Sequence, residues 1–139
     1  MKIVLDTNCL IPILFPTSDA HDVWRAFRYA RYTLCVSTEI LFEYEEILVR
    51  MTGDPEFALY VIEAITNAPN VERINPSFRF NLITSDPDDN KFVDCAITAG
   101  ATYIVSNDRH FDELQKYDFP KVAVRTLAEF MAIVKELFK

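Results

Sequence analysis

Short runs of β-branched and apolar residues alternate along this chain with longer stretches whose apolar residues recur every three or four positions. The clearest short runs cover residues 2–5, 34–36, 103–106 and 121–124, and residues 71–74 form a weaker one. Such runs are typical of buried strands. The longer stretches, at 18–31, 37–51, 53–69, 88–101 and 126–139, indicate amphipathic helices. Strands alternating with helices predict a parallel sheet covered by helices, so we expect an α/β protein with a three-layer α/β/α sandwich.

The chain has 139 residues and contains no linker or repeat, so we expect one domain, residues 1–139. Its apolar runs are too short to cross a bilayer, and residues 1–6 do not resemble a signal peptide. We therefore expect a cytoplasmic protein with no membrane partner. The three cysteines show no metal-binding spacing and lie among apolar neighbours, which predicts reduced, buried thiols at Cys9, Cys35 and Cys95.

The formal net charge of -7 argues against a broad basic surface for duplex nucleic acid. It is compatible with a nucleic-acid enzyme whose acids cluster around a metal ion. It is equally compatible with a basic protein partner.

Two aspartates directly follow predicted strands. Asp6 comes after the run at residues 2–5, and Asp108 follows the run at residues 103–106, within Ser106-Asn107-Asp108. Ligands of an open parallel sheet bind at the carboxyl ends of its strands, so these acids are candidates for one site. The alternative is that each only caps a turn or a helix.

Glu43 is the third candidate acid. It lies three residues after Ile40 and four before Ile47, so it shares the apolar stripe that faces the sheet. Burial of a lone carboxylate is costly, and a bound cation would remove that cost. The alternative is a glutamate at the edge of the stripe that reaches water.

Asp89 is the fourth candidate, because at about 100° per residue it stands at the N-terminal end of the stripe formed by residues 92, 93, 96 and 97. Asp94 is its nearest competitor. The same helical phase turns Asp94 away from the stripe, so we expect it on a solvated surface beside Lys91. Asp86 and Asp88 precede the helix and suit capping.

The run at 86–97 resembles a calcium-binding loop, but Lys91 stands where glycine is required and Ile97 where glutamate is required. Carboxylates without a histidine or cysteine partner instead favour Mg²⁺ or Mn²⁺ and phosphoryl chemistry. We expect His110 at the surface or in a cap. Neutral side chains near the predicted strand ends could orient the acids or a water: Thr7, Asn8, Ser37 and Asn107.

The start VLDTN, the spacing of Ser37 and Glu43, the block DPDDNKFVDCAITAGATYIVSND and the closing helix together resemble the PIN domain family. The resemblance is to the group described as toxins of toxin–antitoxin systems. It implies a metal-dependent endoribonuclease, a phosphodiester hydrolase that cuts single-stranded RNA. It also implies a five-stranded parallel sheet in order 3-2-1-4-5, a homodimer and a small antitoxin partner. The implied core acids are Asp6, Glu43 and Asp89, with Asp108 as a more variable fourth that Asp112 could replace or support.

Two other functions remain open at this point. An aspartyl-phosphate phosphatase also places an aspartate after its first strand, but it usually has a second aspartate two positions on, where this chain has Asn8. A non-catalytic binding module could also retain an acidic pocket of this kind.

Overall fold

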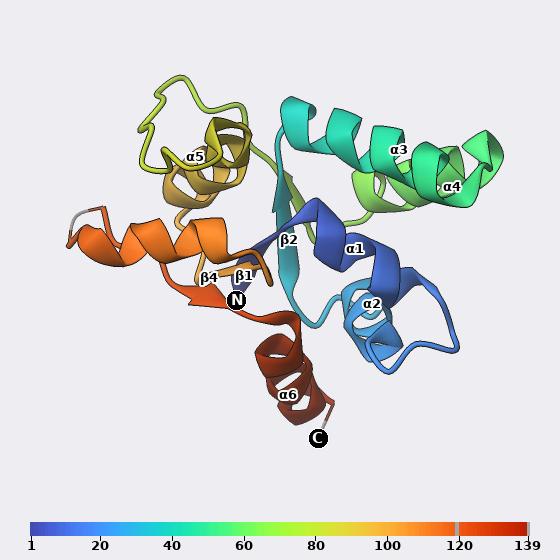
Figure 1. Cartoon of the computed structure of the whole chain (residues 1–139). Coiled ribbons are helices and arrows are strands. Elements are labelled where there is room, and N and C mark those ends of the chain that lie inside the picture. The colour runs from blue at the N-terminus through green and yellow to red at the C-terminus, as the bar shows by residue number, and fades with distance from the viewer. Residues whose placement is uncertain (119, 139) are drawn as a thin grey trace.

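The computed structural model describes residues 1–118 and 120–138, and it contains the predicted parallel sheet (Figure 1). The five strands pair in the order β3-β2-β1-β4-β5, and all four pairings are parallel. The α/β/α class and the strand order are therefore confirmed. The strands are β1 (Lys2–Leu5), β2 (Thr33–Val36), β3 (Val71–Arg73), β4 (Tyr103–Val105) and β5 (Val124–Arg125).

Six α-helices and two 3₁₀-helices are described around this sheet. The α-helices are α1 (Thr7–Leu14), α2 (His21–Arg28), α3 (Thr38–Thr52), α4 (Pro55–Thr66), α5 (Asn90–Ala99) and α6 (Leu127–Leu137). The 3₁₀-helices are η1 (Pro87–Asp89) and η2 (Arg109–Lys116). Helix α5 packs on β1, β2 and β4, whereas α2 contacts both α1 and α6, and α3 runs beside α4. The central strand β1 is buried between these layers.

Some elements differ from the sequence prediction. Helix α1 was not expected, because its short apolar run contains Pro12 and such runs do not distinguish helix from strand. The last strand lies at Val124–Arg125, at the end of the predicted run 121–124 and one residue beyond it. Helix α6 ends at Leu137, and residue 139 of the predicted helix lies outside the described residues.

Local signals account for where the helices begin and end. Asp54 caps α4 by accepting a hydrogen bond from the Phe57 amide, at 3.0 Å. Gly100 ends α5 with a left-handed φ of 66°, as its position in the sequence predicted. The three cysteines are free and buried, which confirms the predicted packing role.

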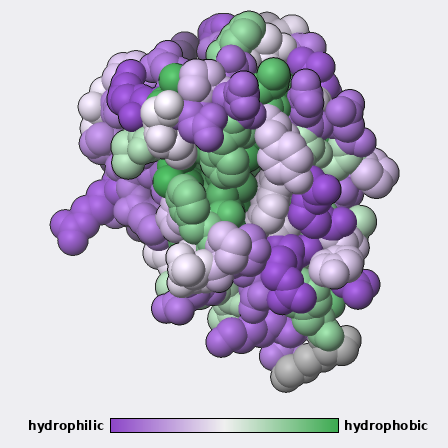
Figure 2. Space-filling model, turned by 90° about the vertical axis from the view of Figure 1, so that its right-hand side faces the viewer, coloured by the Kyte–Doolittle hydropathy of each residue, from purple (hydrophilic) through white to green (hydrophobic). Residues whose placement is uncertain are grey.

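One face of the molecule carries a band of apolar side chains. Figure 2 looks at the side on which α3 and α4 lie and shows a band of hydrophobic side chains along a hollow. Phe15, Leu59 and Tyr60 are exposed, and a cavity of about 330 Å³ lies between α2 and α4, lined in part by Phe27 and Tyr60. Within the described part of the chain, no helix combines the length and the apolar character needed to cross a membrane.

Candidate metal centre

Asp6 and Asp108 are brought together at the carboxyl ends of the two adjacent central strands, β1 and β4. The hydroxyl of Ser106 donates a hydrogen bond to Asp6 Oδ2 at 2.8 Å. The same oxygen, Ser106 Oγ, accepts one from the Asp108 amide at 2.9 Å. Asp6 is almost fully buried, with 4% of its surface exposed. Ser106 therefore fixes both acids at one edge of the sheet.

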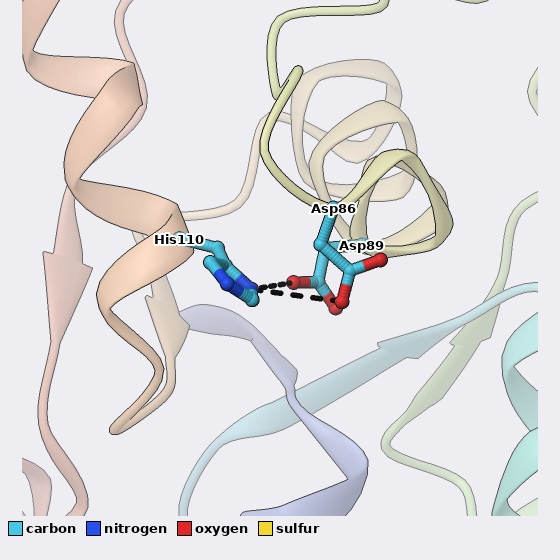
Figure 3. A group of neighbouring side chains, drawn as sticks. All are labelled: Asp86, Asp89 and His110. Atoms are coloured by element: carbon cyan, nitrogen blue, oxygen red, sulfur yellow. Dashed lines mark hydrogen bonds and ion pairs between the residues drawn. The ribbon is translucent and has the colours of Figure 1, made fainter.

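Asp89 is placed at the same edge of the sheet by the 3₁₀ turn η1, which directly precedes α5. Asp86 caps this turn by accepting a hydrogen bond from the Asp88 amide, and Pro87 occupies its first position. Figure 3 shows Asp86 and Asp89 pointing from this turn toward one side chain, His110. The turn thus presents two carboxylates where the sequence predicted one.

His110 comes from η2 and lies among three acids. Its Nδ1 lies 3.3 Å from Asp89 Oδ2 and 3.5 Å from Asp86 Oδ2 (Figure 3). The same nitrogen is 3.1 Å from Asp108 Oδ1. One ligand atom from each of Asp86, Asp89 and His110 can lie within 4.8 Å of the others, close enough to share a metal ion. Sequence reasoning treated His110 as a surface or cap residue and did not connect it with the acids.

The loop before η1 is held in place by two side chains. Asn90 is buried, accepts a hydrogen bond from the Ile83 amide and donates one to the Ile83 carbonyl, each at 2.9 Å. Glu113 accepts hydrogen bonds from the Thr84 amide and hydroxyl and from the Ser85 amide, at 3.1, 2.8 and 2.7 Å. These bonds lower the pKa of Glu113 to about 2. They fix the path of the chain into Asp86 and Asp89.

Glu43 is held by two neighbours on α1 and α5. The Thr7 hydroxyl donates a hydrogen bond to Glu43 Oε2. Lys91 Nζ lies 2.8 Å from Glu43 Oε1 and 2.8 Å from Asp88 Oδ2. The Lys91 side chain is only 8% exposed, so the expectation that Lys91 lies on a solvated surface is wrong. Helix α3 and the 3₁₀ turn cover the side of α5 from which it projects.

Asp94 is also buried, which corrects the prediction that it faces solvent. Only 2% of its surface is exposed, and its Oδ1 accepts a hydrogen bond from the Phe80 amide at 3.1 Å. Burial raises the pKa of Asp94, partly offset by that hydrogen bond. The helical phase correctly turned Asp94 away from the stripe, but the chain around residue 80 lies on that side of α5.

Of the supporting residues that the sequence suggested, Thr7 contacts a candidate acid directly. Ser37 instead caps α3 through its hydroxyl, and Asn107 accepts a hydrogen bond from the first amide of α6. Asn8 is exposed on the first turn of α1. Asp112 is exposed on η2 and lines a cavity of about 630 Å³ that adjoins Asp108.

The site carries more negative charge than its surroundings neutralise. Burial raises the pKa of Asp6, and the carboxylates of Asp108 and Glu43 raise it further against the opposing hydrogen bond from Ser106. Burial and the charges of Asp86, Asp108 and Asp6 raise the pKa of Asp89 to about 6. Burial lowers the pKa of His110, but the hydrogen bond to Asp89 and the charges of nearby acids outweigh it, so that pKa is raised.

This donor set fits a divalent cation. Crowded carboxylates repel one another when ionised, and a bound cation removes that repulsion. Carboxylate oxygens suit Mg²⁺ and Mn²⁺, whereas the imidazole of His110, which the sequence prediction did not include, is more typical of transition-metal ions. Asp86, Asp89 and His110 each place one ligand atom within 4.8 Å of the others, and Asp108 and Asp6 lie beside this group.

Comparisons with known proteins agree with the fold. A family model described as PIN domain matches residues 2–110, a range that contains every candidate acid named above except Asp112. The chain belongs to the PIN domain family. Among solved structures it is similar to one described as VapBC2 from Rickettsia felis bound to a DNA fragment from their promoter. That match has 17% sequence identity and a TM-score of 0.61, and covers 91% of this chain and 98% of the other. A comparison with curated proteins finds no match.

Proposed function

We propose that this protein is a metal-dependent endoribonuclease that cuts single-stranded RNA and acts as the toxin of a toxin–antitoxin pair. The observation that carries the proposal is the group of Asp86, Asp89 and His110, close enough to share a metal ion, which lies beside Asp108 and the buried Asp6 at the carboxyl edge of a PIN-family sheet. Burial of several acids without an equal number of cations is costly, so such a cluster needs a function that uses it.

Asp6, Asp89 and Asp108 would hold Mg²⁺ or Mn²⁺, with Asp86 and His110 as additional ligands. A cation bound there would neutralise the scissile phosphate and lower the pKa of a water molecule. Ser106 keeps Asp6 in a single orientation by donating to its Oδ2. Glu43, oriented by the Thr7 hydroxyl, would accept a hydrogen bond from the attacking water and align it with the phosphorus.

An RNA substrate also needs positive charge near the acids. A hollow of about 630 Å³ adjoins Asp108, and basic side chains line it at Arg109, Lys121 and Arg125. These cations would bind the phosphates that flank the cleaved one. The net charge of -7 makes a local patch of this kind more suitable than a broad basic surface.

The apolar face would bind the protein partner. Phe15, Leu59 and Tyr60 are exposed, and Tyr60 also lines the cavity between α2 and α4. Exposed apolar patches on soluble domains commonly mark protein interfaces. A small antitoxin or a second copy of the chain would cover it, and the similar Rickettsia felis structure is itself described as VapBC2.

The proposal is tested with chelator-treated protein and single-stranded RNA, with Mg²⁺ or Mn²⁺ added back. Cleavage should require the added metal and should fall at least about a hundredfold in Asp89→Asn, as removal of a metal ligand predicts. Asp19→Asn, which removes the same charge at an exposed position, is the control and should cleave normally.

Equal cleavage by the wild type and Asp89→Asn would disprove the proposed centre. Hydrolysis of small phosphomonoesters without cleavage of RNA would identify a phosphatase instead. RNA binding with no hydrolysis under any metal would identify a non-catalytic module.

A further inference from the structure

Lys91 is a nearly buried cation whose donors are all used within the protein. Its ammonium lies 2.8 Å from Glu43 Oε1, 2.8 Å from Asp88 Oδ2 and 3.0 Å from the Asp88 carbonyl oxygen. An ammonium has three N–H donors, and these are three acceptors. The side chain is 8% exposed, and its charge also lies 5.3 Å from the centre of the Phe92 ring. Such a lysine is held in one position.

Glu43 has different polar partners from the acids around His110. One carboxylate oxygen of Glu43 accepts the Thr7 hydroxyl and the other pairs with Lys91. Asp89, Asp86 and Asp108 pair instead with His110, on the other side of the 3₁₀ turn. Glu43 is therefore paired with a lysine, whereas Asp89 has the His110 imidazole and no ion pair of Asp6 is found among the described residues.

A divalent ion placed against Glu43 would lie close to the Lys91 ammonium and be repelled by it. The same ion placed among Asp6, Asp89 and Asp108 would meet carboxylates and the His110 imidazole, with no lysine beside it. The two halves of the acidic cluster thus differ in the cation that suits them.

We propose that Lys91 takes the place of a second metal ion, so that the cluster binds one divalent cation while Lys91 holds Glu43 as a positioned, metal-free carboxylate. Lys91 is thus a positioning residue that acts through Glu43. The inference rests on the proposed function because it assumes that the acids bind a metal. It adds the number of ions and the role of Lys91 in keeping Glu43 free of metal.

The test is a calorimetric titration of Mn²⁺ into the chelator-treated full chain, without RNA. The wild type and Lys91→Arg should each bind one ion. Lys91→Met, similar in length but neutral, should bind a second Mn²⁺ at the released Glu43 and Asp88. In thermal melts, Mn²⁺ should raise the melting temperature of Lys91→Met more than that of the wild type. A merely structural lysine would change stability without changing the number of ions.

Glu43→Gln keeps the test decisive if Lys91→Met does not fold. It should bind one Mn²⁺ within about threefold of the wild-type affinity, whereas Asp89→Asn should lose at least about tenfold. Any one of three results would overturn the inference: two ions in the wild type, an equal loss of Mn²⁺ affinity in Glu43→Gln and Asp89→Asn, or a single ion in folded Lys91→Met. Two ions would leave the proposed nuclease intact, and one bound ion without RNA cleavage would overturn only the nuclease.

Discussion

Replacement of Asp89 by asparagine should stabilise the metal-free protein while abolishing its metal binding. The folded protein raises the pKa of Asp89 from 3.8 to about 6, first through burial and then through the neighbouring carboxylates. A shift of about two units corresponds to about 3 kcal/mol against the ionised form, at 1.36 kcal/mol per unit. Asparagine resembles the neutral acid, so Asp89→Asn should gain up to about 3 kcal/mol above pH 6, or roughly 10 °C in melting temperature.

The difference in stability between Asp89→Asn and the wild type should depend on pH. Because the folded pKa is the higher one, the folded state binds the proton more tightly, and stability falls as pH rises from about 4 to about 6. Urea denaturation in chelator should therefore show Asp89→Asn clearly more stable than the wild type at pH 7.5, with the two converging near pH 4.

Metal should remove most of that difference. Mn²⁺ at a hundred times its dissociation constant should stabilise the wild type by about 2.7 kcal/mol and leave Asp89→Asn nearly unchanged. Asp19→Asn controls for the loss of one negative charge. If Asp89→Asn is no more stable than the wild type at pH 7.5 in chelator, the acids do not repel one another as the geometry indicates.

Three further substitutions test the supports of the site. Asn90→Ala removes the hydrogen-bond partners of the buried Ile83 amide and carbonyl, so the free energy of unfolding measured in urea should fall by about 2–4 kcal/mol. A fall below about 1 kcal/mol would contradict the role of Asn90. Glu113→Gln should lower the urea midpoint at neutral pH, and the difference from the wild type should shrink as pH falls from 4.5 to about 2, because Glu113 stabilises the fold only while its carboxylate is ionised. A difference that stays constant with pH would exclude that cause. Gly100→Ala places a Cβ in a left-handed conformation with no atom within 4 Å, so thermal melts should show a loss of about 1–2 kcal/mol from the backbone alone, and no loss would contradict the conformation.

The framework of the site follows from patterns that the sequence displays. Buried strands end where their apolar runs end, so Asp6 and Asp108 could be placed at the sheet edge from those runs. Helical phase placed Asp89 toward the same edge and separated it from Asp94. Each of these inferences depends only on one strand or one helix and its periodicity.

The rest depends on parts of the chain that have no periodicity. His110 lies in a 3₁₀ segment, and the loop that brings Asp86 to it is fixed by hydrogen bonds from Asn90 and Glu113 to backbone groups. Single polar side chains that bind distant backbone atoms leave no repeating signal. Lys91 and Asp94 were misplaced for a related reason, because phase shows which way a side chain points but not what covers it.

The Ser106–Asp6 hydrogen bond joins residues that are 100 positions apart in the chain. During synthesis, Asp6 emerges long before Ser106, Asp108 and His110 exist. A partly translated chain therefore holds Asp6, and later Asp86 and Asp89, before the residues that complete the centre, Asp108 and His110, exist. If the centre cuts RNA, a nascent chain cannot attack the message from which it is being made until nearly the whole domain has been translated and β4 has joined β1.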